Sequence, residues 1–218
     1  MVNKMKNGIV WVRTPKCATT TMAEHLEGFC KWKGVRYIPQ NEHGLMAPIN
    51  FVNLGHLWGG DVNWDTVKRE QRGVMGSVRN PLNRFLSHYK HHLREGRNFE
   101  YGNDVSSFYL ENYNREHFED AFRGIDNYLC KYLNVGDDNS WDSSLIKERY
   151  DFFTITEQFE NSLVQFEKLT GYSVPNKELV KNRTESTLVL TDEFLELFKE
   201  RNKNDFELYN FVISEYGR

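Results

Sequence analysis

The sequence contains few cysteines and no long apolar run, and each shortage excludes a class of protein. Its 218 residues include three cysteines, Cys17, Cys30 and Cys130, which are far apart and form no C-x-x-C pair. This odd number excludes a disulfide framework or a zinc site made of cysteines alone, and is typical of a reducing compartment. Because no segment resembles a signal peptide or a membrane span, we expect a cytoplasmic protein without a membrane partner.

A large excess of charge of either sign is also lacking. The formal net charge is −3, from 28 basic and 31 acidic residues, so the composition indicates no nucleic-acid partner. Aromatic residues make up 14% of the chain, which argues against disorder. The length suits one domain with a full hydrophobic core, and we expect residues 1–218 to form a single domain.

Apolar strand-like runs alternate with amphipathic segments along the chain. This order predicts an α/β fold, with a mostly parallel central sheet and helices on both faces. In such sheets ligands bind beyond the carboxyl ends of the strands. Strands are predicted at 8–12, 35–38, 51–58, 72–78 and 152–155. Helices are predicted at 20–31, 81–95, 143–149, 159–170 and 192–214, with broken helix over 104–133.

The loop after the first predicted strand lacks the glycines of the nucleotide-triphosphatase loop. That loop reads G-x-x-x-x-G-K-[ST], whereas residues 13–21 here read R-T-P-K-C-A-T-T-T. The N-terminus of the helix that follows favours an anion, and Lys16 and the threonine hydroxyls add charge and hydrogen-bond donors. On this loop alone, an anion site and an ordinary threonine helix cap remain alternatives.

A second segment with phosphate-binding chemistry follows the strand at 72–78. Arg79 comes directly after it, and Ser87 lies eight residues later in the next predicted helix. The planar guanidinium suits a phosphate, and a serine two turns along reaches the same side of the helix. Arg84 is instead a candidate for an ion pair with an acid. Taken alone, this segment is equally typical of a surface arginine that ends a strand.

Together, these two segments resemble the sulfotransferase family that uses 3′-phosphoadenosine 5′-phosphosulfate (PAPS). The resemblance rests on T-P-K-x-x-T-T-T followed by V-R-N-P-L-N-R-F-L-S-H-Y, covers most of the chain, and is closest to carbohydrate enzymes of the uronyl 2-O-sulfotransferase type. G-H-L at 55–57, T-I-T-E-Q-F-E at 154–160 and K-N-R-T-E at 181–185 also fit. The resemblance implies a P-loop-like sulfotransferase fold, PAPS as co-substrate and a hydroxyl-bearing acceptor, expected to be a glycan.

The resemblance also implies a role for each matching residue. Lys16 would contact the bridging oxygen of the phosphosulfate, and residues 17–21 would surround the 5′-phosphate. Arg79 and Ser87 would bind the 3′-phosphate, and the loop at 183–184 would close over the nucleotide. The residues implied to bind PAPS are Lys16, Cys17, Ala18, Thr19, Thr20, Thr21, Arg79, Ser87, Arg183 and Thr184.

Two residues are candidates for the base that takes the acceptor proton. His56 matches the histidine of the G-H-[VL] segment in the 2-O branch, and an imidazole near neutrality suits proton abstraction. Glu42 is the alternative, because other carbohydrate branches place a glutamate in the loop region where it lies. A half-buried hydrogen-bonding histidine and a solvated loop acid are the corresponding non-catalytic interpretations. We favour His56 as the base.

No metal is expected. Lys16, Arg79 and backbone N–H groups already match the anionic donor, so catalysis requires mainly positioning and electrostatic stabilisation. His88, His91 and His92 lie on one predicted helix, and His88 and His92 have the i, i+4 spacing of helical zinc ligands. No acidic ligand adjoins them and basic residues surround them, which predicts a basic face. A P-loop-type small-molecule kinase and a non-catalytic nucleotide-binding module remain as alternative functions.

Overall fold

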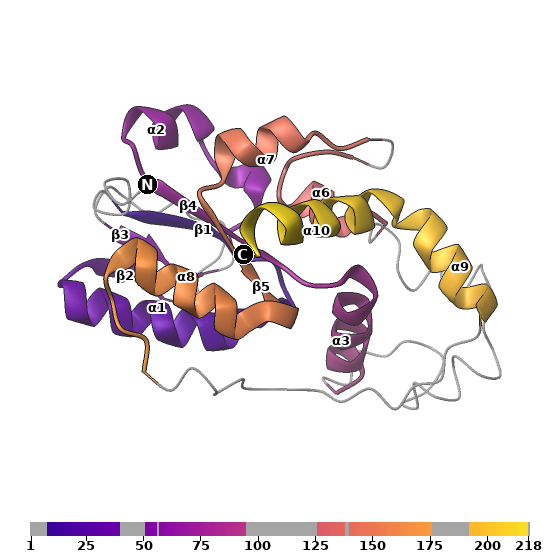
Figure 1. Ribbon diagram of the computed structural model, residues 1–218, viewed down its shortest axis with the longest axis horizontal. Helices are drawn as coiled ribbons and strands as arrows, with labels where there is room; N and C mark the ends of the chain where they lie inside the picture. The colour runs from indigo at the N-terminus through magenta and orange to yellow at the C-terminus, as the bar shows by residue number, and fades with distance from the viewer. Residues whose placement is uncertain are drawn as a thin grey trace.

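In the part of the chain that the structure describes, five parallel strands form the central sheet. A computed structural model describes residues 8–39, 51–55, 57–94, 126–137, 140–175 and 192–217. The strands lie in the order β2-β3-β1-β4-β5, and each neighbouring pair is parallel, which confirms the predicted α/β fold (Figure 1). The strands are β1 (Ile9–Val12), β2 (Arg36–Ile38), β3 (Phe51–Asn53), β4 (Gly73–Val78) and β5 (Phe152–Ile155).

Helices cover both faces of the sheet. They are α1 (Thr19–Lys33), α2 (Trp64–Arg69), α3 (Pro81–Arg94), α6 (Tyr128–Tyr132), α7 (Ser143–Arg149), α8 (Phe159–Thr170), α9 (Asp192–Arg201) and α10 (Lys203–Tyr216), with 3-10 turns η2 (Gly59–Asp61) and η3 (Thr156–Gln158). Side chains alternate between faces along β1. Ile9 and Trp11 therefore pack with α1 and α8, whereas Val10 and Val12 pack with α2, α6, α7 and α10 (Figure 1).

The third strand and the segment after it differ from the sequence prediction. The strand predicted at 51–58 ends at Asn53, because the Asn53 side chain accepts the N–H of Gly55 at 2.8 Å and turns the chain. A short helix that was not predicted, α2, begins after Asn63, whose side chain accepts the N–H of Thr66. Polar side chains that bond to nearby backbone decide both boundaries.

The helix predicted as continuous over 192–214 is two helices, α9 and α10, which meet at Asn202. The Asn202 side chain is buried, accepts the N–H of Asn127 at 3.1 Å, and donates to the Phe198 carbonyl at 3.0 Å. An asparagine that bonds to backbone in this way competes with helical hydrogen bonding. The break therefore depends on a contact with a distant segment, which helical periodicity does not reveal.

The loops after β1 and β4 leave the sheet side by side. Val12 lies next to Gly76 in the register of these neighbouring strands. From β1 the chain continues to β2 and β3 on one side of the sheet, whereas β4 leads to β5 on the other. Such a reversal of strand order is where open α/β sheets bind their ligands.

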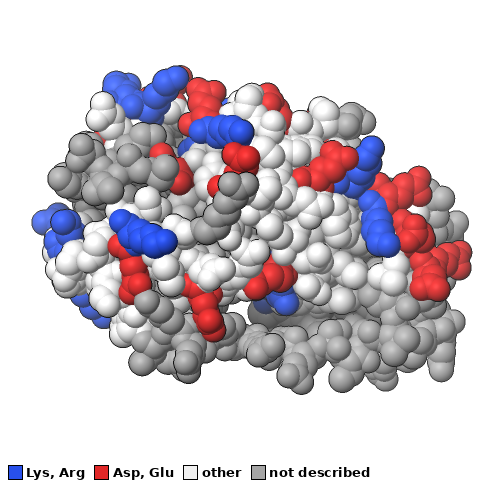
Figure 2. Space-filling model, viewed as in Figure 1, with Lys and Arg blue, Asp and Glu red and all other residues white. Residues whose placement is uncertain are grey.

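Charges of both signs are mixed over much of the face in Figure 2, and acidic side chains gather where α9 lies. Within the described segments, no helix is long and apolar enough to cross a membrane.

Candidate active site

The loop between β1 and α1 has an unusual backbone. Lys16 and Ala18 have φ angles of 68° and 52°, in the left-handed region that residues other than glycine rarely adopt. Each such residue costs about 1 kcal/mol, and strain of this kind persists at binding and catalytic sites. Left-handed residues in a tight loop turn successive N–H groups toward one side, which favours anion binding.

Helix α1 begins without a side-chain cap. Its N-cap residue is Ala18, which has no side-chain hydrogen bond to offer, and its first turn contains no acidic residue. By contrast, α2 and α7 are capped by the side chains of Asn63 and Asp142. The partial positive charge at the start of α1 therefore meets no anion from its own first turn, which suits an external one.

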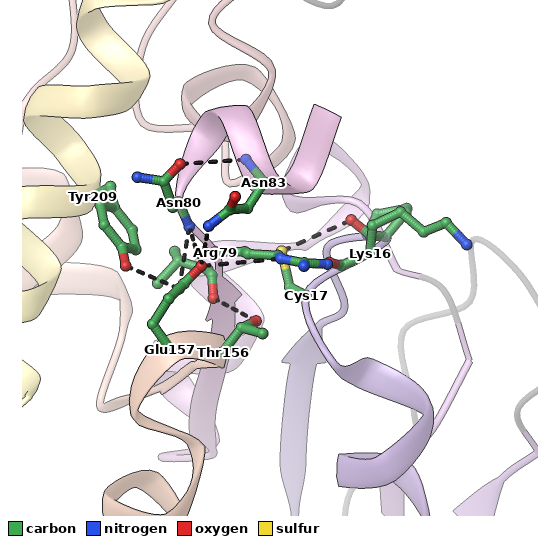
Figure 3. A network of polar contacts seen from close by, with 10 residues as sticks. Lys16, Cys17, Arg79, Asn80, Asn83, Thr156, Glu157 and Tyr209 are labelled. Carbon is green, nitrogen blue, oxygen red and sulfur yellow. Dashed lines mark hydrogen bonds and ion pairs between the residues drawn. The ribbon is translucent and has the colours of Figure 1, made fainter. Parts of the chain in front are cut away.

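Arg79 reaches this loop from the end of β4. Its Nη1 donates to the carbonyl oxygen of Lys16 at 3.2 Å, across 63 positions of the sequence (Figure 3). The Lys16 side chain extends away from Arg79, so the two cationic groups point to different parts of the site (Figure 3). The structure thus brings together the two segments whose sequences suggested phosphate binding.

A carboxylate from a third strand end completes this arrangement. Glu157 follows β5 and accepts the backbone N–H of Asn80, at 3.1 and 3.2 Å to its two oxygens. It also accepts the hydroxyl of Tyr209 at 2.9 Å and the side-chain amide of Asn83 at 3.4 Å. The Nε of Arg79 lies 4.0 Å from a carboxylate oxygen of Glu157 (Figure 3). No role was predicted for Glu157 from the sequence, although its position just past a parallel strand indicates the same edge of the sheet.

A buried arginine lies behind the loop. Arg84 is 2% exposed, and its guanidinium lies over the ring of Tyr128, 4.0 Å from the centroid. Its Nε and Nη1 are buried and have no hydrogen-bond partner in the described part of the chain. Burial lowers the pKa of Arg84. Among the described residues Arg84 forms no ion pair with an acid, and the aromatic face of Tyr128 lies against its guanidinium instead.

Helix α10 fixes the helix that carries Tyr128. The buried carboxylate of Asp205 accepts the N–H groups of Leu129 and Cys130 at 2.8 and 2.9 Å, at the start of α6. At the other end of α6, the Tyr132 hydroxyl donates to the carbonyl of Arg13, the first residue of the loop, at 3.1 Å. Through α6, the C-terminal helix therefore supports the loop that contains Lys16.

The comparisons with known proteins identify the family. A family model described as the sulfotransferase family matches residues 1–212. The chain belongs to the sulfotransferase family. It is accordingly an enzyme that transfers sulfuryl groups to hydroxyl-bearing acceptors. A search of curated proteins found no match. In the described segments of this sulfotransferase, no three histidine, cysteine, aspartate or glutamate side chains cluster as a metal site would require.

The thiol of Cys17, in the loop between β1 and α1, is buried in the protein core. Its side chain is fully buried, with Sγ 3.8 Å from the Pro15 carbonyl oxygen. Burial raises the pKa of the Cys17 thiol to about 12, an effect that Arg84 and Arg79 partly oppose. The thiol is thus neutral near pH 7, and any contact of Cys17 with a ligand would come from its backbone.

The remaining predicted site residues fall into two groups. Thr20 is exposed in the first turn of α1, whereas Thr19 and Thr21 are buried. Ser87 is half-buried in the middle of α3. His56, Glu42, Arg183 and Thr184 lie outside the described residues, as do the side chains of His91 and His92.

The structure describes the residues on either side of position 56. The carbonyl of Leu57 accepts the N–H of Arg13 at 3.3 Å, so the chain there runs beside the start of the Lys16 loop. The Trp58 indole donates to the Lys131 carbonyl at 2.9 Å, which ties the same segment to α6.

Asp205 is expected to make the free energy of unfolding of the sulfotransferase depend on pH. Burial raises the pKa of Asp205 from 3.8 to about 6. Between these values the folded state binds more protons than the unfolded state, so the Asp205 contribution to the free energy of unfolding falls as pH rises. We expect the stability of wild type relative to Asp205→Asn to decrease between pH 4 and pH 7 in urea titrations. A stability difference that is constant over this range would contradict the prediction.

Proposed function

We propose that this sulfotransferase moves a sulfuryl group from PAPS to a carbohydrate hydroxyl, as a single domain of the uronyl 2-O type. Sulfuryl transfer follows from family membership, and the donor and acceptor are the proposal. The observation that carries it is the contact between Arg79 and the Lys16 loop at the start of α1. PAPS has two anionic ends joined through one adenosine, and two cationic segments in contact suit such a ligand.

The described residues fit the donor. The uncapped end of α1 suits the 5′-phosphosulfate, with Lys16 at its bridging oxygen and residues 17–21 around the phosphate. Arg79 and Ser87 suit the 3′-phosphate, and the loop at 183–184 is proposed to close over the nucleotide. No metal is needed in this scheme, because backbone and side-chain donors match the negative charge.

The proposed reaction is an in-line displacement. The acceptor oxygen forms a bond to sulfur while the bond from sulfur to the bridging phosphate oxygen breaks, and 3′-phosphoadenosine 5′-phosphate (PAP) leaves. The charge that develops on this oxygen is stabilised by Lys16 and the start of α1. The acceptor proton passes to His56, with Glu42 as the alternative base.

His56→Ala is expected to lower kcat by roughly 100-fold or more, the usual contribution of a general base, with little change in PAP affinity. The reason is that the base contacts the acceptor and not the nucleotide. Steady-state kinetics with titration of PAP into both proteins would check this. If Glu42→Ala produces this result and His56→Ala does not, the base is Glu42.

A cytoplasmic location is part of the proposal. Cys17, Cys30 and Cys130 are all free thiols, and each is buried. Burial raises the pKa of each, which makes thiols inert rather than reactive. Three free cysteines are in keeping with a reducing compartment.

Ligand-induced stabilisation tests the donor. PAP at 100 times its dissociation constant should raise the free energy of unfolding by about 2.7 kcal/mol, whereas ATP with magnesium should add much less. The reverse order would favour a P-loop-type kinase. Binding of PAP without transfer of label from PAPS to any of a panel of uronic-acid glycans would favour a non-catalytic module.

A further inference from the structure

Two consecutive residues of η3 hold the backbone on both sides of Arg79. The Thr156 hydroxyl donates to the carbonyl of Val78 at 3.1 Å, immediately before Arg79. The Glu157 carboxylate accepts the N–H of Asn80, immediately after it, with both oxygens. The peptide groups that flank Arg79 are therefore both fixed by the segment that follows β5 (Figure 3).

The carboxylate of Glu157 is itself held in place. The Tyr209 hydroxyl, from α10, donates to Oε2 at 2.9 Å, and the Asn83 side chain, from the first turn of α3, lies 3.4 Å from Oε1. Tyr209 is 6% exposed and belongs to the core on the α10 face of the sheet. A buried, packed tyrosine presents its hydroxyl in a fixed direction, so the position of the carboxylate depends on α10.

The side chain of Arg79 is constrained on two edges. Its Nη1 donates to the Lys16 carbonyl at 3.2 Å, and its Nε, which is buried and makes no hydrogen bond in the described part of the chain, forms an ion pair with Glu157 at 4.0 Å. A guanidinium binds a phosphate with two parallel hydrogen bonds only when its plane is correctly oriented. A carboxylate at one edge and a carbonyl at another restrict that plane before any ligand arrives, which lowers the entropic cost of binding.

We propose that Glu157 is a positioning residue that orients Arg79 toward the 3′-phosphate of the nucleotide, and that Tyr209 holds Glu157 in place. The inference rests on the proposed function, because it takes Arg79 as the 3′-phosphate ligand. Glu157 acts through Arg79 and through the Asn80 peptide, so its effect is specific to ligands that carry a 3′-phosphate.

Removal of Glu157 has two opposing effects on the Kd for PAP, so the direction in which the Kd changes shows which effect is larger. A carboxylate near Arg79 also repels a phosphate, so if repulsion dominated, removal of Glu157 would tighten nucleotide binding. Glu157 already accepts hydrogen bonds from Asn80, Asn83 and Tyr209, which offset part of its charge. We therefore expect the loss of orientation to outweigh the relief of repulsion.

Calorimetric titration of PAP and 5′-AMP, which lacks the 3′-phosphate, tests the inference. For Glu157→Ala we expect the Kd for PAP to rise about 10-fold or more, as for a lost hydrogen bond to a charged group, and the Kd for 5′-AMP to change less than about 2-fold. Glu157→Gln retains an oxygen for the Asn80 N–H and should recover most of the PAP affinity. In an Arg79→Ala background, Glu157→Ala should have no further effect on PAP.

Tyr209→Phe removes only a hydroxyl and keeps the packing of the helix, so a loss of PAP affinity in this variant would not result from misfolding. It should weaken PAP binding severalfold and leave 5′-AMP binding unchanged. Tyr216→Phe is the matched control on the same helix, because its hydroxyl donates to the Tyr150 carbonyl instead, and it should change neither Kd.

The outcomes separate the two proposals. If wild type prefers PAP to 5′-AMP and Arg79→Ala abolishes that preference, yet Glu157→Ala and Tyr209→Phe keep it, the positioning role is wrong and the proposed function stands. Tighter binding of PAP by Glu157→Ala would likewise overturn the positioning role. If wild type binds PAP no better than 5′-AMP, the 3′-phosphate assignment fails, and the inference fails with it.

Discussion

Lys16→Met should lower kcat by about 100- to 1000-fold, the usual loss when one group that stabilises a developing oxyanion is removed. Methionine keeps an unbranched side chain but removes the ammonium, and it does not relieve the left-handed backbone that Lys16 adopts at φ 68°. The loss should therefore come from charge alone. Initial rates with labelled PAPS, together with the Kd for PAP, would measure it.

Lys33→Met is the matched control, because Lys33 lies in the last turn of α1, the helix that follows the Lys16 loop, and is exposed. It should leave kcat unchanged. The urea midpoint of Lys16→Met should stay close to that of wild type, since the loop conformation is retained. A Lys16→Met enzyme with nearly normal kcat would remove Lys16 from the leaving-group role.

Arg79→Ala should have the largest effect on nucleotide affinity. Loss of a partly buried charge partner costs about 2–5 kcal/mol, which is a rise in the Kd for PAP of roughly 30-fold to several thousandfold. The Arg79 side chain is 21% exposed, which places the expected loss toward the lower end of that range. Calorimetry with PAP and 5′-AMP would measure the effect, which should be much smaller for 5′-AMP.

Arg69→Ala is the control, because Arg69 is an exposed arginine in α2 whose side chain is 71% exposed. It should bind PAP like wild type. Unchanged PAP affinity in Arg79→Ala would refute the assignment of Arg79 to the 3′-phosphate, and an equal loss for both nucleotides would indicate a damaged loop instead.

Most elements of the fold could be predicted from hydrophobic patterning. The helix at 143–149 and the strand at 152–155 have the predicted bounds, and the strand at 72–78 begins one residue late, at Gly73. In these segments apolar residues either recur at a clear helical spacing or form an uninterrupted run, so the local sequence is sufficient to predict the helix or strand. Errors occurred where one polar side chain bonds to backbone, at Asn53 and at Asn202.

The candidate site was predicted in part. Lys16 and Arg79 were singled out because each follows a strand and carries a suitable charge, and the contact between their loops agrees with that reasoning. The aromatic partner of Arg84 was not predicted, because Tyr128 belongs to a different helix and no spacing rule connects the two. The role of Glu157 was missed for the same reason, since its partners come from α3 and α10.

The sequence by itself determined the succession of strands and helices along the chain, the parallel sheet, and the chemistry of the two segments that are proposed to bind phosphate. These features follow from short-range patterns, because the periodicity of apolar residues and the capping of helices depend on residues only a few positions apart. The tertiary structure alone decided which side chains support the site. Glu157 and Tyr209 lie 52 positions apart, and Leu129 and Asp205 lie 76 apart. Contacts at such separations depend on how strands and helices pack. The energy of that packing comes from many residues across the fold, so no single segment of the sequence predicts these contacts.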